Sequence, residues 1–197
     1  MIGRSEAFWV PLYEKLQKTF DGQLDHVRRK EFVDAMNYSK PGLIRTEADE
    51  LTYSLHVLIR YEIEKMIFAN QVTVDELPAL WNQKYEEYLG LTPSHDGEGV
   101  LQDIHWAGGS FGYFPSYALG SAIAAQIYAF MQTKLDVEDC LIKGNLKPIE
   151  EFLKEYIHQY GASKNTKELL FDMSGEAFNS DYYIAYLTDK YTKLYQL

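Results

Sequence analysis

The side chains best suited to chemistry are concentrated in residues 99–120, GVLQDIHWAGGSFGYFPSYALG. This segment places glutamine, aspartate, histidine, tryptophan and tyrosine side chains among five glycines. An apolar run with small residues, 118–131, follows it and predicts a buried helix. A polar and aromatic loop that leads into a buried helix is typical of a catalytic or binding wall, and glycines let the backbone approach a ligand closely. The spacing alone also fits an aromatic turn that caps a core helix, and it assigns no reaction.

Two motifs in the chain resemble those of one enzyme family. GVLQDIHW, residues 99–106, is similar to the GxxQDxHW motif of the Taq-type zinc metallocarboxypeptidases, and IRTEAD, residues 44–49, is similar to that family's IRxxAD motif. The motifs occur in the family's order, and the resemblance covers nearly the whole chain. It implies a mainly helical metallopeptidase fold with at most a minor β element, and release of C-terminal amino acids from peptides.

The metal motif of that family has no counterpart in this sequence. Family members hold zinc with the two histidines of an HExxH helix and a downstream glutamate, whereas none of the five histidines here begins such a motif. Residues 1–197 therefore resemble a single C-terminal portion of the enzyme domain, from a split or truncated gene or a cut piece. The resemblance implies zinc in the complete enzyme, no metal ligand and no bound zinc in this chain alone, and a missing N-terminal metal-binding half as partner.

The resemblance also assigns the substrate contacts. A carboxypeptidase must recognise the free α-carboxylate of its substrate, and arginine does so with a planar fork that is always charged. Arg45 is expected in this role, and a structural pair with Asp49 is the alternative. His105 is expected to donate to the substrate carbonyl or terminal group, and a tyrosine phenol to the tetrahedral oxyanion. The candidate catalytic residues are His105, Tyr113 and Tyr117; the candidate substrate-binding residues are Arg45, Asp49, Gln102, Asp103, His105 and Trp106.

Composition narrows the class of protein further. A net charge of −10 argues against nucleic acid and anionic membranes as partners. The single cysteine, Cys140, excludes an internal disulfide and fits a reducing compartment. Residues 1–20 carry charges throughout and lack the apolar core of a signal peptide, and the apolar run 118–131 is too short for a membrane span. We therefore expect a soluble, cytoplasmic protein.

Helical periodicity extends along most of the chain. Thr46 is expected to cap the longest helix, with Asp49 as its capping-box partner, and Gly90 is expected to end the next helix. Strands are possible only at residues 72–74 and 100–106. The expected helices are 5–20, 29–38, 47–69, 73–89, 118–131, 137–143, 148–160, 166–173 and 181–194.

Three polar side chains form a stripe on the 47–69 helix. His56, Arg60 and Glu64 recur four residues apart, a spacing that favours a solvated, salt-bridged face. The alternative is a polar wall of the substrate cleft. The acidic and histidine side chains of loop 91–98 have no regular spacing, which favours a hydrated loop over a metal site.

These observations favour the substrate-binding part of a zinc metallocarboxypeptidase, inactive alone and acting on peptide C-termini. A non-catalytic remnant that binds peptides or dimerises is the alternative, and a plain helical interaction protein is a second. We also expect an apolar seam at Phe8, Trp9, Leu12 and Leu16 to drive homo-oligomer formation.

Overall fold

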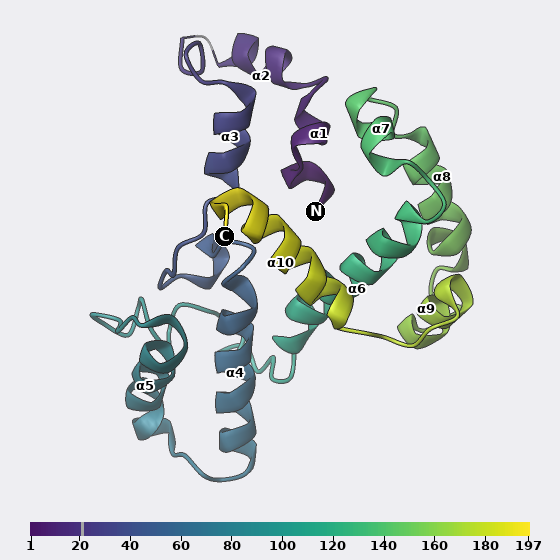
Figure 1. Cartoon of the computed structure of the whole chain (residues 1–197). Coiled ribbons are helices and arrows are strands. Elements are labelled where there is room, and N and C mark those ends of the chain that lie inside the picture. The colour runs from purple at the N-terminus through teal and green to yellow at the C-terminus, as the bar shows by residue number, and fades with distance from the viewer. Residues whose placement is uncertain (21) are drawn as a thin grey trace. The chain divides into compact units, whose positions relative to one another are not determined.

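The computed structural model describes residues 1–20 and 22–197, in which helices are the only regular elements (Figure 1). The mainly helical class expected from the resemblance is confirmed. The two possible strands, at residues 72–74 and 100–106, do not form. Residues 72–74 lead into a 3-10 helix, and residues 99–106 form consecutive turns because their N–H groups bond to nearby carbonyls, as Gln102 does to Gly99.

Contacts group the described residues into two compact units, residues 38–120 and residues 1–37 with 121–197. The expectation of a single domain portion stays a prediction. None of the helices in the described ranges is long and apolar enough to span a membrane.

The unit of residues 38–120 is built on two helices that pack side by side, α4 (Tyr53–Phe68) and α5 (Leu77–Leu89) (Figure 1). Short 3-10 helices, Arg45–Glu47 and Val74–Glu76, precede them. Gly90 ends α5 at φ +66°, as expected, because glycine adopts this left-handed conformation without a Cβ clash. The main apolar cluster of this unit comprises the buried side chains of Ile59, Ile63, Trp81, Tyr85 and Leu89.

The start of α4 corrects one prediction. The helix begins at Tyr53 rather than at Glu47, and Thr46 does not cap it. The Asp49 carboxylate accepts the N–H groups of Leu51 and Thr52 at 2.9 and 3.0 Å, which holds the chain in a turn before the helix. Glu47, Asp49 and Glu50 therefore lie ahead of the helix, in the connection that carries the IRTEAD motif.

The other unit contains short N-terminal helices and the C-terminal half of the chain. The expected 5–20 helix is interrupted after Trp9, where Pro11 offers no N–H group. Phe8 packs against the buried core of this unit, whereas Leu12 is 38% exposed. The helices are α1 (Glu6–Trp9), α2 (Tyr13–Thr19), α3 (Arg29–Met36), α6 (Pro115–Gln132, in this unit from Ser121 on), α7 (Val137–Ile142), α8 (Lys147–Tyr156), α9 (Thr166–Ser174) and α10 (Asp181–Tyr195), with 3-10 helices at Ile2–Arg4 and His158–Tyr160.

Candidate functional site

The two motif segments meet at Arg45 and Asp103. The Arg45 guanidinium donates to Oδ1 of Asp103 from Nη2 at 2.6 Å and from Nε at 3.1 Å, across 58 residues of sequence. Its Nη1 donates to the hydroxyl of Tyr53 at 3.1 Å. The backbone N–H of Arg45 also donates to Oε1 of Gln102 at 2.9 Å. Side-chain and main-chain bonds therefore join IRTEAD to QDIHW.

A second arginine, Arg60 of α4, shares the same carboxylate. Its Nε donates to Oδ2 of Asp103 at 2.7 Å, and the Arg60 and Asp103 side chains are 0% and 9% exposed. Among residues 1–20 and 22–197, Asp103 is the carboxylate bonded to both guanidinium groups. Two buried arginines therefore share one aspartate, and the hydrogen-bonded cluster has an excess of positive charge.

The surroundings of Asp103 and Arg45 favour the charged form of both side chains. Burial by itself would raise the pKa of the Asp103 carboxyl, but the hydrogen bond from Arg45 and the charge of Arg60 lower it below its ordinary value. Burial likewise opposes the charge of Arg45, yet its bonds to Asp103 and Tyr53 leave its pKa raised. Both groups are therefore ionised at neutral pH.

Aromatic rings surround the two guanidinium groups. The Cζ atom of Arg60 lies 4.6 Å from the Trp81 ring centroid, and that of Arg45 lies 4.9 Å from the Tyr117 centroid. Phe114 is within 5.5 Å of both cations and is 1% exposed. Such cation–π contacts favour a charged guanidinium and strengthen when water is excluded.

His105 lies at the edge of this cluster. Its Nε2 is 3.1 Å from the Tyr117 hydroxyl, and its Nδ1 is 4.0 Å from Oδ1 of Asp103, which is too long for a hydrogen bond. Within the described part of the chain, Nδ1 has no hydrogen-bond partner although it is buried. Tyr113 is tilted against the imidazole at 5.7 Å between ring centroids and is 52% exposed. In the described residues, one ring nitrogen of the imidazole is therefore left without a hydrogen bond.

Trp106 is fixed by a buried carboxylate. Oε1 of Glu64 accepts the indole N–H of Trp106 at 2.7 Å, and Oε2 accepts the backbone N–H of Gly112 at 3.0 Å. Gly112 has a φ of +73°, which favours glycine. Glu64 thus ties together the two ends of loop 106–112, which separates His105 from Tyr113.

Asp49, an acidic residue of the first motif, bonds to nearby side-chain and backbone groups. Arg45 does not pair with it, because the Asp49 carboxylate bonds to the hydroxyl groups of Ser39 and Thr52 and to the Lys40 N–H. Burial would raise its pKa, but these bonds lower it. Its expected contact with substrate stays a prediction, as do the substrate roles of the other motif residues.

The stripe on α4 is buried, so the interpretation as a solvated face was wrong. His56, Arg60 and Glu64 are 0%, 0% and 4% exposed. Nδ1 of His56 lies 3.1 Å from the Tyr85 hydroxyl. Burial, followed by the positive charges of Arg60 and Arg45, lowers the pKa of His56 to about 4, so the imidazole is neutral at pH 7.

Sequence reasoning missed the partners that α4 and α5 contribute. Tyr53 and Tyr85 gave no signal beyond helical periodicity, although each hydroxyl contacts a buried arginine. Tyr53 lies seven residues before Arg60 on the same face of α4, a spacing that could have identified it, whereas nothing in the sequence marked Tyr85 as an arginine partner.

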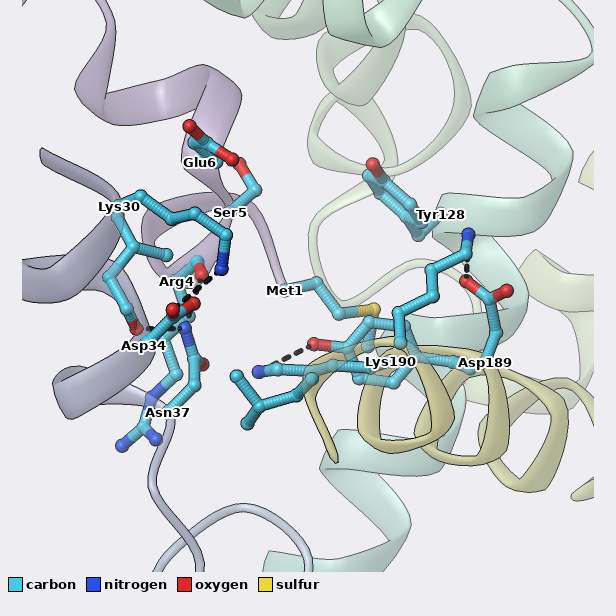
Figure 2. A pocket seen from close by; sticks show the side chains of 14 residues that line it. Met1, Arg4, Ser5, Glu6, Lys30, Asp34, Asn37, Tyr128, Asp189 and Lys190 are labelled. Atoms are coloured by element: carbon cyan, nitrogen blue, oxygen red, sulfur yellow. Dashed lines mark hydrogen bonds and ion pairs between the residues drawn. The ribbon is translucent and has the colours of Figure 1, made fainter. Parts of the chain in front are cut away.

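The family's metal does not fit the described residues. Outside residue 21, no group of three histidine, cysteine, aspartate or glutamate side chains is arranged to hold an ion. A cavity of about 400 Å³ lies in the unit of residues 1–37 and 121–197, and its lining includes the ion pairs Lys30–Asp34 and Lys193–Asp189 (Figure 2). None of the motif residues lines it, so we place the candidate site at the Arg45–Asp103 cluster instead.

A helical protein that joins these two motifs through one buried charge cluster falls in the class of helical metallopeptidases. Residues 1–191 match the family model described as Carboxypeptidase Taq (M32) metallopeptidase, and the chain belongs to that family.

Individual relatives agree with this assignment. The chain is 52% identical to Carboxypeptidase 1 of Bacillus subtilis and 38% identical to Thermostable carboxypeptidase 1 of Thermus thermophilus, over 100% and 99% of its length. It matches the crystal structure of the M32 carboxypeptidase from Deinococcus radiodurans with a TM-score of 0.96, at 35% identity over 100% of this chain and 40% of that one. The chain spans 39% and 38% of the lengths of the two curated relatives.

Proposed function

We propose that this chain is the substrate-binding part of a zinc metallocarboxypeptidase, which holds the C-terminal residue of a peptide while its last peptide bond is cleaved. The observation that carries the proposal is the charge of the buried cluster, in which two guanidinium groups share the Asp103 carboxylate. Burying a charge without a full counter-charge is costly. A substrate α-carboxylate would supply the missing negative charge.

Arg45 is better suited than Arg60 to receive that carboxylate. Arg60 is 0% exposed and its guanidinium donates to four acceptors, whereas Arg45 is 6% exposed and donates to Asp103 and Tyr53. Among the described residues, Nη1 and Nη2 of Arg45 therefore each keep one N–H without an acceptor. These two N–H groups can bind a carboxylate in the bidentate way that favours arginine.

His105 and its tyrosines would act on the reacting end of the substrate. Nδ1 of His105 can donate to a substrate carbonyl or terminal group when it carries the proton, and the Tyr117 hydroxyl bonded at Nε2 fixes the ring. A phenol of Tyr113 or Tyr117 would donate to the tetrahedral oxyanion. Trp106 and Gln102 shape this site rather than react.

Zinc would come with residues outside the described chain, since no metal site fits these residues. In the complete enzyme, the metal would activate water and polarise the carbonyl. The missing metal-binding part and the peptide C-terminus are therefore the partners that we propose. A cytoplasmic location and a homo-oligomer also stay predictions, and light scattering of the purified chain tests the second.

The test uses a chimera in which the remaining part of the Bacillus subtilis relative precedes Met1. Arg45→Ala removes a charge-assisted contact worth about 1.5–3 kcal/mol, so kcat/KM for peptides with a free C-terminus should fall roughly 10- to 150-fold. For an amidated peptide, kcat/KM of the wild-type chimera should be low. The variant should show nearly the same low value, because amidation and Arg45→Ala remove the same interaction.

The comparison separates recognition from folding. If Arg45→Ala only disturbed the fold, kcat/KM would fall by the same factor for free and amidated peptides. Multiplicative losses, or a wild-type chimera that cleaves both peptides equally well, would contradict the proposed function.

A further inference from the structure

Arg60 binds the side chains of both adjacent polar residues of the second motif, although it lies outside both motifs. Besides the bond from Nε to Asp103, its Nη2 donates to Oε1 of Gln102 at 2.8 Å. On the other side, Nη1 donates to the His56 carbonyl at 2.8 Å and to the Tyr85 hydroxyl at 3.2 Å. The four acceptors lie around one planar group, which fixes its position in the unit.

This arrangement determines which way the Gln102 amide faces. A guanidinium is only a donor, so Gln102 must present its oxygen to Arg60 and its NH₂ group in the opposite direction. That NH₂ group donates to the carbonyls of Leu43 and Glu98 at 3.0 and 2.8 Å. The same oxygen then accepts the backbone N–H of Arg45. The amide orientation that Arg60 requires therefore also anchors the IRTEAD segment.

The same guanidinium fixes the rotation of the Asp103 carboxylate. Oδ2 accepts from Arg60, which leaves Oδ1 for Nε and Nη2 of Arg45. If Oδ2 were released, the carboxylate could rotate and Arg45 would lose its fixed orientation. Arg60 thus acts on Arg45 by two routes, through the Asp103 side chain and through the Gln102 amide.

We propose that Arg60 is a positioning residue for substrate recognition: it does not touch the substrate but sets the orientation in which Arg45 receives the substrate carboxylate. The proposal rests on the proposed function of Arg45. Because Arg60 is fully buried between Trp81 and Phe114, direct contact with a peptide is excluded in this structure. Lysine could not replace it, since a single ammonium cannot bond to Asp103, Gln102 and Tyr85 in one plane.

The experiment compares Arg60→Lys with wild type in the same chimera, using free and amidated peptides. We expect the preference for the free C-terminus, the ratio of the two kcat/KM values, to fall at least about fivefold, mainly through KM. Arg28→Lys is the matched control, because Arg28 is 81% exposed and its carboxylate partner Glu31 is local. The control should keep the wild-type preference.

The melting temperature of each variant is measured alongside, and the kinetics are recorded well below it. A folded Arg60→Lys chimera that keeps the full preference overturns the positioning role while the proposed function of Arg45 stands. A wild-type chimera without the preference overturns both. If Arg60→Lys does not fold, Tyr85→Phe removes only one of the four acceptors; it should lower the preference in the same direction by a smaller factor, and an unchanged preference again overturns the role.

Discussion

The indole N–H of Trp106 donates to Glu64 across 42 residues of sequence, at 2.7 Å, while the second oxygen of Glu64 accepts the Gly112 N–H at 3.0 Å. Each oxygen of one buried carboxylate therefore satisfies a different donor on loop 106–112. Loss of the carboxylate would leave the half-buried indole N–H of Trp106 and the N–H of the exposed Gly112 without this acceptor. Glu64 thus links α4 to both ends of this loop by hydrogen bonds.

Glu64→Gln should destabilise the unit of residues 38–120 by about 1–3 kcal/mol. An amide has only one oxygen, so either Trp106 or Gly112 must face an NH₂ group. Trp81 and Trp106 lie in this unit and Trp9 in the other, so fluorescence in a Trp9→Phe background reports on the unit in urea. Glu87→Gln is the matched control, because Glu87 is an exposed partner of Lys84 on α5. Equal midpoints for the two variants would contradict the role of Glu64.

His56 makes the same unit sensitive to acid. Its pKa is about 4 in the folded protein against the ordinary 6.5, so the unfolded chain binds the proton more tightly. The stability that depends on neutral His56 is therefore complete above pH 6.5 and is lost as the pH falls toward 4. Between pH 7 and pH 5 the expected loss is about 2 kcal/mol.

Urea unfolding of wild type and His56→Gln at both pH values measures this loss. The variant should lose about 2 kcal/mol less than wild type between pH 7 and pH 5, because glutamine does not titrate. His95→Gln is the control, since His95 is 65% exposed in the same unit. The idea fails if His56→Gln and wild type show the same dependence on pH.

The sequence predicted the helices and the motif residues better than it predicted their contacts. Gly90 was placed correctly at the end of α5 because the left-handed conformation is a local property. The burial of Arg60 was not predictable from α4 alone. Charged residues spaced four apart occur both on solvated helix faces and in buried clusters. Arg60 is buried because it pairs with Asp103, which lies 43 residues away in the sequence.

The resemblance to the family predicted site residues that helical periodicity could not, but only residues inside the two motifs. It indicated Arg45 and Asp103 separately, and the structure pairs them. From the sequence, only Asp49 of the same motif was considered as a structural partner of Arg45, whereas the structure pairs Arg45 with Asp103. The choice follows from local chemistry: Asp49 is occupied by the N–H groups of Lys40, Leu51 and Thr52.

The two tyrosines beside His105 should differ in a way that kinetics can detect. Tyr117 bonds to His105 and stacks on Arg45, whereas Tyr113 is half exposed and touches the imidazole only through its ring. If a phenol donates to the oxyanion, its replacement by phenylalanine should lower kcat by about 10²-fold or more with little change in KM. Tyr117→Phe should in addition loosen the orientation of the His105 ring, since it removes the hydroxyl at Nε2.

The separate effects on kcat and KM in the chimera distinguish these roles. We expect Tyr113→Phe to lower kcat and to leave KM unchanged, because the variant keeps the bond between His105 and Tyr117. Tyr117→Phe should also raise KM, because the His105 ring loses the hydroxyl that holds it in place. If both variants keep the wild-type kcat, neither tyrosine donates to the oxyanion. The described residues place no other tyrosine against the His105 ring.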